Sequence, residues 1–454
     1  MTREHEKLDG GLGAPRECAG EGRRPSAPGA AQAALRNPSD DAAQRGGTRR
    51  SRGGATGASP PGRGRSPRAT FSRRTGWDLN ANALAARVEA ARTEGRPLLD
   101  LTESNPTQAG LGWPAERLQA ALARSGVDAY RPDPRGHPGA RRAVAAYLAA
   151  RAGPVAIDRI LLTASTSDAY GYLLKLLCDP GDDVLVPAPA YPLLDLLAGL
   201  EAVELRRYPL REEGGWHLDL PALRAAIGPR TRAVLAVSPS NPVGAVLSAE
   251  ELAALDEICA ERGLALIADE VFADTAPEGA PSALGVRRAL AFHLSGLSKV
   301  CGLPQLKVGW IAAAGPEARV APALERLEMI ADAYLSVSAP SQLALESLLP
   351  ERHAFLGPLR ARLDGNRARL ESLAYAPFAP LPWRGGWSAV LRIDEAIDEE
   401  ALCLALIEDG VVVHPGFFFD FERPGYLVVS LMCEPALFTQ GLERLARRLR
   451  DRWP

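Results

Sequence analysis

The feature that most restricts the fold of this chain is a repeated alternation of short apolar runs with stretches of helical periodicity. One helical stretch is SAEELAALDEICAERG, in which Ser248 and Glu251 have the spacing of a capping box. Because parallel strands are joined by helical crossovers, the alternation predicts an α/β fold with a mostly parallel sheet sandwiched by helices. Ligands of such a sheet gather at the carboxyl ends of its strands. The runs interpreted as strands are RILLTAS, PGDDVLVPAPAY, RAVLAVSPSNPVG, LALIADEVF and AFHLSGLSK.

Two regions flank this core, and we expect them to form a smaller α+β domain together. The first contains a helical stretch, NALAARVEAARTEG, followed by a short strand and a turn in PLLDLTESNPT. The second contains three runs typical of strands, GGWSAVLRI, GVVVHPGFFF and GYLVVSLM, and a closing helix. The predicted limits are 71–115 for the N-terminal segment of the small domain, 116–330 for the large domain and 331–454 for the C-terminal part of the small domain.

Residues 1–70 differ from the rest of the chain in composition. From Met1 to Thr75 there are 15 Lys and Arg against 7 Asp and Glu, whereas the remainder has 38 basic and 48 acidic residues. The segment has almost no large apolar residue and cannot offset its chain entropy by burial, so we predict a disordered, basic, low-complexity tail. A basic arm for nucleic acid or an anionic membrane is the alternative, but we expect neither partner and interpret the segment as a dispensable tail or a misplaced start.

Composition also excludes several classes of protein. The six cysteines form no CxxC pair, which favours free thiols and a cytoplasmic location. No run of 18 apolar residues could cross a membrane, and no apolar signal core precedes the body. The chain has no metal-type Cys/His spacing, so we expect no metal site. It has no Walker loop and no GxGxxG after a strand, which argues against the commonest nucleotide-binding sites.

Lysine is rare in this chain, and its positions are therefore informative. There are 49 arginines and only four lysines, two of which, Lys299 and Lys307, lie in SGLSKVCGLPQLKVGW. A lysine amine can lose its proton and attack a carbonyl to form a Schiff base, whereas a guanidinium stays charged. The alternative is that both are ordinary surface cations.

The order of the loops resembles that of the fold-type I pyridoxal-phosphate enzymes. From about Phe71 to the C-terminus the chain resembles a class I/II aminotransferase of the aspartate aminotransferase superfamily, through SGLSK, TASTSDAY, DPGDDVLVP, PAPAYP, SPSNPVG and IADEVF. The resemblance implies that the cofactor is pyridoxal 5′-phosphate. It also implies ping-pong transfer of an amino group between an amino acid and a 2-oxo acid.

The resemblance assigns one end of the cofactor to SGLSK and TASTSDAY. Lys299 would hold the cofactor aldehyde and move a proton during turnover, and Lys307 stands where the family usually has a phosphate-binding arginine. A hydroxyl is often found where this chain has Gly296, so Ser295 or Ser298 would supply it instead. The implied phosphate ligands are Ser165, Thr166 and Ser167.

The remaining cofactor contacts are implied on three loops. Tyr191 would stack on the pyridine ring, Asn241 would donate to its phenolic oxygen, and Asp269 would pair with its protonated nitrogen. Phe272 stands where the family often has a tyrosine that donates to the same phenolic oxygen. Tyr130, in AYRPDPRGHPGARRAVAAYL, would reach the phosphate of a neighbouring subunit, which implies a homodimer.

Substrate binding departs from the family pattern. The family's carboxylate-binding arginine is replaced by Val428 in GYLVVSL. Arg384 in PWRGGW and Arg392 in VLRI are candidate replacements, and Asn105 in TESNPT is another possible carboxylate contact. Each has a structural alternative, a surface cation for either arginine and an Asn-Pro turn for Asn105.

Two other functions stay open at this point. A C–S lyase that acts by β-elimination, or a related lyase, uses the same lysine, aspartate and phosphate site on the same fold. A catalytically silent regulator also occurs on this fold, but the basic segment lacks the apolar periodicity of a DNA-binding domain.

Overall fold

The computed structural model describes residues 70–124, 126–335, 337–373 and 378–452, so the predicted tail lies outside the described residues except for Thr70. Its centre is a sheet of eight strands in the order β2-β9-β8-β7-β6-β3-β4-β5. Strands β9 and β5 run antiparallel to their neighbours, while the other adjacent pairs are parallel. The prediction of a mostly parallel sheet is confirmed. The strands are β2 (Ile160–Thr163), β3 (Asp183–Ala188), β4 (Glu204–Glu212), β5 (Trp216–Leu218), β6 (Thr231–Val237), β7 (Ala265–Asp269), β8 (Leu290–Gly296) and β9 (Gly309–Ala314).

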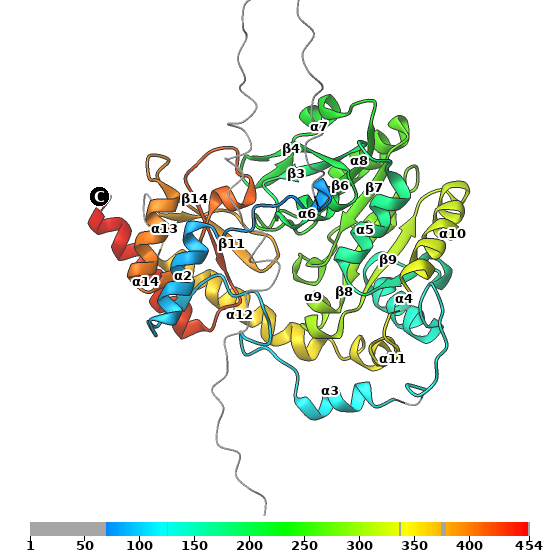
Figure 1. The fold of residues 1–454 in the computed structure, drawn as a ribbon, viewed down its shortest axis with the longest axis horizontal. Coiled ribbons are helices and arrows are strands. Elements are labelled where there is room, and N and C mark those ends of the chain that lie inside the picture. The colour runs from blue at the N-terminus through cyan, green and yellow to red at the C-terminus, as the bar shows by residue number, and fades with distance from the viewer. Residues whose placement is uncertain (1–69, 125, 336, 374–377, 453–454) are drawn as a thin grey trace, which may run out of the picture.

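Helices cover both faces of this sheet (Figure 1). Strand β7 has apolar side chains on both faces, and both faces need cover from solvent. Ala265 and Ile267 belong to one buried apolar cluster, whereas Leu266 and Ala268 belong to a second cluster on the opposite face. A strand buried on both faces has a continuous apolar sequence, as LALIAD does. The helices around the sheet are α3 (Ala115–Leu122), α4 (Pro138–Ala152), α5 (Thr166–Leu177), α6 (Leu193–Leu200), α7 (Leu220–Ala226), α8 (Ala249–Arg262), α9 (Leu297–Val300), α10 (Glu317–Tyr334) and α11 (Ala339–Leu348).

The second unit joins the two ends of the described chain. Its four-stranded antiparallel sheet has the order β10-β11-β14-β13, and the N-terminal strand β1 pairs in parallel with β12. The small α+β unit built from N- and C-terminal segments is therefore confirmed. Its strands are β1 (Leu99–Asp100), β10 (Ala379–Pro380), β11 (Ser388–Arg392), β12 (Val411–Val412), β13 (His414–Pro415) and β14 (Tyr426–Ser430), and its helices are α2 (Ala83–Thr93), α12 (His353–Leu373), α13 (Glu399–Glu408) and α14 (Pro435–Arg452).

The limits of the domains stay a prediction. The boundary expected after residue 330 falls inside α10, which packs against α5 and the large sheet. Ion pairs join the two units, with Arg207 on β4 contacting Asp420 at 2.8 Å and Arg392 on β11 contacting Glu212.

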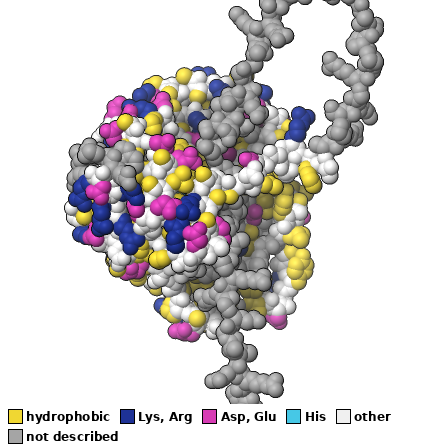
Figure 2. Space-filling model, turned by 60° about the vertical axis from the view of Figure 1, so that its left-hand side comes forward, with side chains coloured by type: hydrophobic (Ala, Val, Ile, Leu, Met, Phe, Trp, Pro, Cys, Tyr) yellow, Lys and Arg dark blue, Asp and Glu magenta, His cyan; other side chains and the backbone are white. Residues whose placement is uncertain are grey.

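The surface in Figure 2 carries basic and acidic side chains next to one another on the face turned forward. Among the helices in the described part of the chain, none combines the length and the apolar character needed to span a bilayer.

Candidate active site

Lys299 lies in α9, directly after the carboxyl end of β8. Its Nζ atom is 4.4 Å from the ring centroid of Trp387 and 5.5 Å from that of Phe272. Desolvation lowers the pKa of Lys299 to about 8, although the nearby Asp269 carboxylate opposes the shift. A lysine with such a pKa has a substantial fraction of free amine at neutral to mildly alkaline pH.

Asp269 ends the neighbouring parallel strand β7, opposite Leu294 of β8. Its side chain is buried, with Oδ2 accepting a 2.7 Å hydrogen bond from the Tyr170 hydroxyl and Oδ1 accepting one of 3.1 Å from the Val271 amide. Burial raises the pKa of Asp269, whereas these two hydrogen bonds lower it. Both hydrogen-bond donors are neutral, so neither balances the charge of this carboxylate when it is ionised.

Asn241 follows the next strand of the sheet, β6. Its Oδ1 accepts a 3.3 Å hydrogen bond from the hydroxyl of Ser388 on β11 of the small sheet. This contact orients the side-chain amide and joins the two units at the site. Strands β6, β7 and β8 thus bring Asn241, Asp269 and Lys299 to one edge of the sheet.

The start of α5 lies at the same edge and is closely approached by β9. A Cβ atom at Gly309 would lie 3.1 Å from the Thr166 amide nitrogen, so a side chain there would crowd the start of α5. Lys307, two residues before Gly309, is exposed and has a left-handed backbone with φ of 53°. Ser165 caps α5 by accepting a 3.1 Å hydrogen bond from the Asp168 amide. First-turn amides, such as those of Thr166 and Ser167, have no intrahelical acceptor and can bind an anion.

Three further candidates lie near these loops. Ser295 is fully buried at the end of β8, and its hydroxyl has no hydrogen-bond partner within the described residues. Ser298, adjacent to Lys299, is half-buried. Tyr191 is half-buried, and burial raises its pKa.

The other candidates are placed differently. Tyr130 is 85% exposed. Asn105 Oδ1 accepts hydrogen bonds from the Thr107 amide at 3.1 Å and the Thr107 hydroxyl at 2.9 Å, which is an Asx-turn. The exposed Arg384 places its guanidinium 3.5 Å from the Val246 carbonyl.

Val428 is buried in β14, directly between Val390 and His414 of the adjacent strands. Burial lowers the pKa of His414 to about 4, so this ring is neutral at pH 7. His414 therefore does not replace the charge of a guanidinium at position 428.

Sequence reasoning missed Tyr170, Trp387 and Ser388. Tyr170 lies four residues after Thr166 and thus on the same face of α5, but this spacing alone does not single out a tyrosine. Trp387 follows two glycines directly before β11, and Ser388 begins this strand, which meets the site through the packing of the small sheet.

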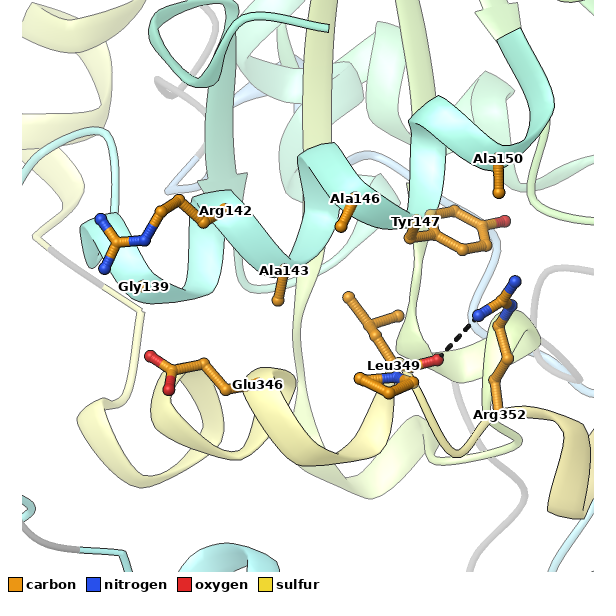
Figure 3. Close-up of a pocket in the computed structure, with 10 residues that line it drawn as sticks. Gly139, Arg142, Ala143, Ala146, Tyr147, Ala150, Glu346, Leu349 and Arg352 are labelled. Atoms are coloured by element: carbon orange, nitrogen blue, oxygen red, sulfur yellow. Dashed lines mark hydrogen bonds between the residues drawn. The ribbon is translucent and has the colours of Figure 1, made fainter. Parts of the chain in front are cut away.

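A separate cavity of about 470 Å³ lies between α4 and α11 and contains none of these residues (Figure 3). Arg142 faces Glu346 at one end of it, and Tyr147 faces Arg352 at the other. The Tyr147 hydroxyl donates a 2.8 Å hydrogen bond to Asp274. Because its lining contains neither Lys299 nor Asp269, we do not assign the chemistry to this cavity.

Comparison with known proteins gives consistent results. The family profile described as aminotransferase class I and II matches residues 96–449. The chain is 31% identical over 261 residues to the glutamate-pyruvate aminotransferase AlaA of Escherichia coli K12, and this match spans 56% of the chain and 64% of AlaA, just under two thirds. It is 28% identical over 386 residues to the alanine aminotransferase of Mycobacterium tuberculosis H37Rv, covering 80% of this chain and 88% of that protein. The crystal structure of an aminotransferase from Escherichia coli superposes with a TM-score of 0.74 at 26% identity, covering 81% of this chain and 95% of that one.

Proposed function

Because the chain belongs to the family of class I and II aminotransferases, we propose that it is an aminotransferase that uses pyridoxal 5′-phosphate. It would move an amino group between an amino acid and a 2-oxo acid by a ping-pong mechanism. The observation that carries the proposal is the shielded amine of Lys299, with its pKa near 8, which follows strand β8 beside the strand that ends at the buried carboxylate of Asp269.

Three observations support the fit of this cofactor. The Asp269 carboxylate is buried with neutral donors only, which suits a protonated ring nitrogen. The Ser295 hydroxyl is buried without a partner in the described part of the chain, so it is available to a ligand. Gly309 keeps side-chain atoms away from the Thr166 amide, where a phosphate would bind.

Bound pyridoxal 5′-phosphate supplies an electron sink for the negative charge that develops when the substrate loses its Cα proton. Lys299 would hold the cofactor through Nζ. When free, Nζ would accept the Cα proton and later release it, which its pKa near 8 permits. Asp269 would keep the ring nitrogen protonated, since an adjacent carboxylate favours a cation.

The other residues would bind and orient the cofactor. Asn241 would donate Nδ2 to the phenolic oxygen, because its Oδ1 already accepts from Ser388. Tyr191 would pack on the ring. The phosphate would be bound by Lys307 and by the start of α5 with Ser165, Thr166 and Ser167, while Ser295 or Ser298 would supply a further hydroxyl.

The working unit in this proposal is a homodimer. Tyr130 is 85% exposed, and the Arg135–Glu328 ion pair, 2.7 Å long, joins its segment to α10. Met329 on α10 is 70% exposed, and Leu335 just after this helix is 71% exposed. Large apolar side chains exposed on neighbouring segments favour a protein interface, through which Tyr130 would reach the partner's cofactor phosphate.

We also propose that the protein is cytoplasmic. The cysteines in the described ranges are free thiols rather than disulfides, as expected in a reducing compartment: Cys178, Cys259, Cys301, Cys403 and Cys433.

One observation favours a second candidate, a C–S lyase that acts by β-elimination. Val428 stands where the family usually has the arginine for the substrate carboxylate, and the adjacent His414 is neutral at pH 7. Asn105 and Arg384 remain proposed carboxylate contacts, and both would serve either reaction.

Absorbance spectra of the purified protein test the proposal. The wild type, Lys299→Ala and the control Lys175→Ala are each titrated with a panel of amino acids, and then with 2-oxoglutarate or pyruvate. Lys175 pairs with Glu201 on the outer side of α5, so its removal should leave the cofactor band intact. Transamination predicts that amino acids convert the band to that of the aminated cofactor and that oxo acids restore it. Ammonia and an oxo acid without aminated cofactor would support the lyase, and the lack of any lysine-dependent band would contradict both.

A further inference from the structure

Tyr170 of α5 contacts the buried carboxylate of Asp269. It lies in the second turn of α5, and its hydroxyl donates a 2.7 Å hydrogen bond to Oδ2 of Asp269, 99 residues along the chain. Oδ1 is occupied by the Val271 amide. The two oxygens of this carboxylate thus have separate donors, one from the backbone of its own loop and one from a helix.

We propose that Tyr170 is a positioning residue that keeps Asp269 ionised and fixes its orientation toward the cofactor ring nitrogen. This inference rests on the proposed function, because it assigns a role relative to bound pyridoxal 5′-phosphate. It adds a residue that neither the sequence motifs nor the resemblance identified.

The surroundings of Asp269 make such a donor necessary. Burial disfavours the charged form of a carboxylate, and the adjacent Glu270 carboxylate disfavours it further. The groups that oppose these effects are the Tyr170 hydroxyl of α5, the Val271 amide, and the His293 ring of β8. The Lys299 amine of α9 is also close enough to interact with the Asp269 charge. Without the Tyr170 hydroxyl, Oδ2 would lose its hydrogen-bond donor.

The position of Tyr170 in α5 gives this contact a second consequence. Thr166 begins α5 at the proposed phosphate site, and Tyr170 follows it by four residues, on the same face of the helix. Four residues of α-helix rise about 6 Å. One rigid element therefore carries both the phosphate-binding amides and the group that holds Asp269, so the helix sets the distance between the two ends of the cofactor site.

The test measures cofactor affinity rather than turnover. Pyridoxal 5′-phosphate is titrated into the apo form of the wild type, Tyr170→Phe, Asp269→Asn and the double variant, with the dissociation constant read from absorbance. Because hydrogen bonds to a charged group are strong, we expect Tyr170→Phe to weaken binding about tenfold. The same change in the Asp269→Asn background should have little effect. The pH below which affinity falls should move upward in Tyr170→Phe, because Asp269 is protonated more readily there.

Two controls separate positioning from packing. Tyr172→Phe removes a hydroxyl from the same helix, where the ring packs on Tyr334 at 5.4 Å, and should bind the cofactor like the wild type. Thermal unfolding of each apo protein reports loss of fold, and Tyr170→Met replaces Tyr170→Phe if the latter does not fold. Equal affinity of wild type and Tyr170→Phe, or an equal loss in the Asp269→Asn background, would overturn the inference while leaving the proposed function intact. Failure of the wild type to bind the cofactor would instead contradict the proposed function.

Discussion

The Nζ atom of Lys299 lies 4.4 Å from the ring centroid of Trp387, which is only 4% exposed. Phe272 packs edge-on against this ring, with 5.3 Å between centroids and an interplanar angle of 66°. Each ring has two opposing effects on the Lys299 amine. The face of the ring attracts the protonated amine, whereas the exclusion of water by the ring disfavours the charge. The pKa of Lys299 is lowered to about 8, so desolvation is the larger effect.

Trp387→Ala should therefore raise the pKa of Lys299 toward its ordinary value of 10.5, because water reaches the amine. At pH 8 the free-amine fraction would fall from about half to about 0.3 per cent for a complete shift. The measurement is the rate at which the apo protein captures the cofactor aldehyde as a function of pH, whose inflection should move upward. Trp216→Ala is the matched control, since Trp216 packs on Phe421 on another part of the large sheet. An inflection that stays near 8 in Trp387→Ala would show that the indole does not shield the amine.

Phe272→Tyr should change the titration of the bound cofactor. Phe272 is 8% exposed and lies 5.5 Å from Lys299 Nζ, so a hydroxyl added there would enter the site. A hydrogen bond to the anionic phenolic oxygen of the cofactor favours the deprotonated form of the bound cofactor. The pKa of the bound cofactor, read from its absorbance, should therefore fall by about one unit. Titration of the holo-protein spectrum checks this, with Phe272→Leu as the control without a donor. If the pKa of the tyrosine variant does not fall, the missing hydroxyl is not what sets the wild-type value.

The sequence was most informative where polar residues directly follow apolar runs. Asn241 and Lys299 come shortly after β6 and β8, and Asp269 ends β7, which lies between these two strands in the sheet. Their placement on one edge follows from parallel strand order alone.

Contacts between distant segments could not be predicted in this way. Tyr170 meets Asp269 across 99 residues and Ser388 meets Asn241 across 147, and both contacts depend on how a helix or the small sheet packs. Strand β4, ELRRYPLRE, was not predicted either, because its charged side chains interrupt the apolar pattern near the sheet edge. The role of Tyr130 stays a prediction that depends on a second subunit.

His293→Gln should destabilise the large unit. His293 Nδ1 lies 3.3 Å from Oε2 of the buried Glu270 carboxylate, whose Oε1 accepts from Ser282 and Ala283. Burial opposes ionisation of Glu270, but His293 and these hydrogen bonds lower its pKa on balance. Loss of a polar partner of a buried carboxylate costs about 3 kcal/mol, measurable as a lower midpoint of urea unfolding.

The pH dependence of that loss has a defined sign. A lowered carboxylate pKa stabilises the fold above the unfolded-state value, and this contribution is lost as pH falls through the folded-state pKa. In His293→Gln the Glu270 carboxylate is protonated at higher pH, which relieves its burial cost. The difference between wild type and variant should therefore be largest near pH 7 and shrink toward pH 4. A difference independent of pH would indicate a packing defect rather than loss of the contact with the Glu270 carboxylate.

Leu335→Asp should shift the proposed dimer toward monomers. Leu335 is 71% exposed directly after α10, close in sequence to Tyr334, which is 58% exposed. Burying an unpaired carboxylate in an interface is costly, so the dimer dissociation constant should rise by about a hundredfold. Sedimentation velocity over a dilution series measures this constant, and Leu200→Asp on α6, where Leu200 is 37% exposed, is the control for adding a charge elsewhere. Because Tyr130 would reach the cofactor phosphate of the partner subunit, monomeric Leu335→Asp should also bind pyridoxal 5′-phosphate more weakly than the dimer. If the dimer dissociation constant changed equally in Leu335→Asp and Leu200→Asp, the interface would lie on another surface.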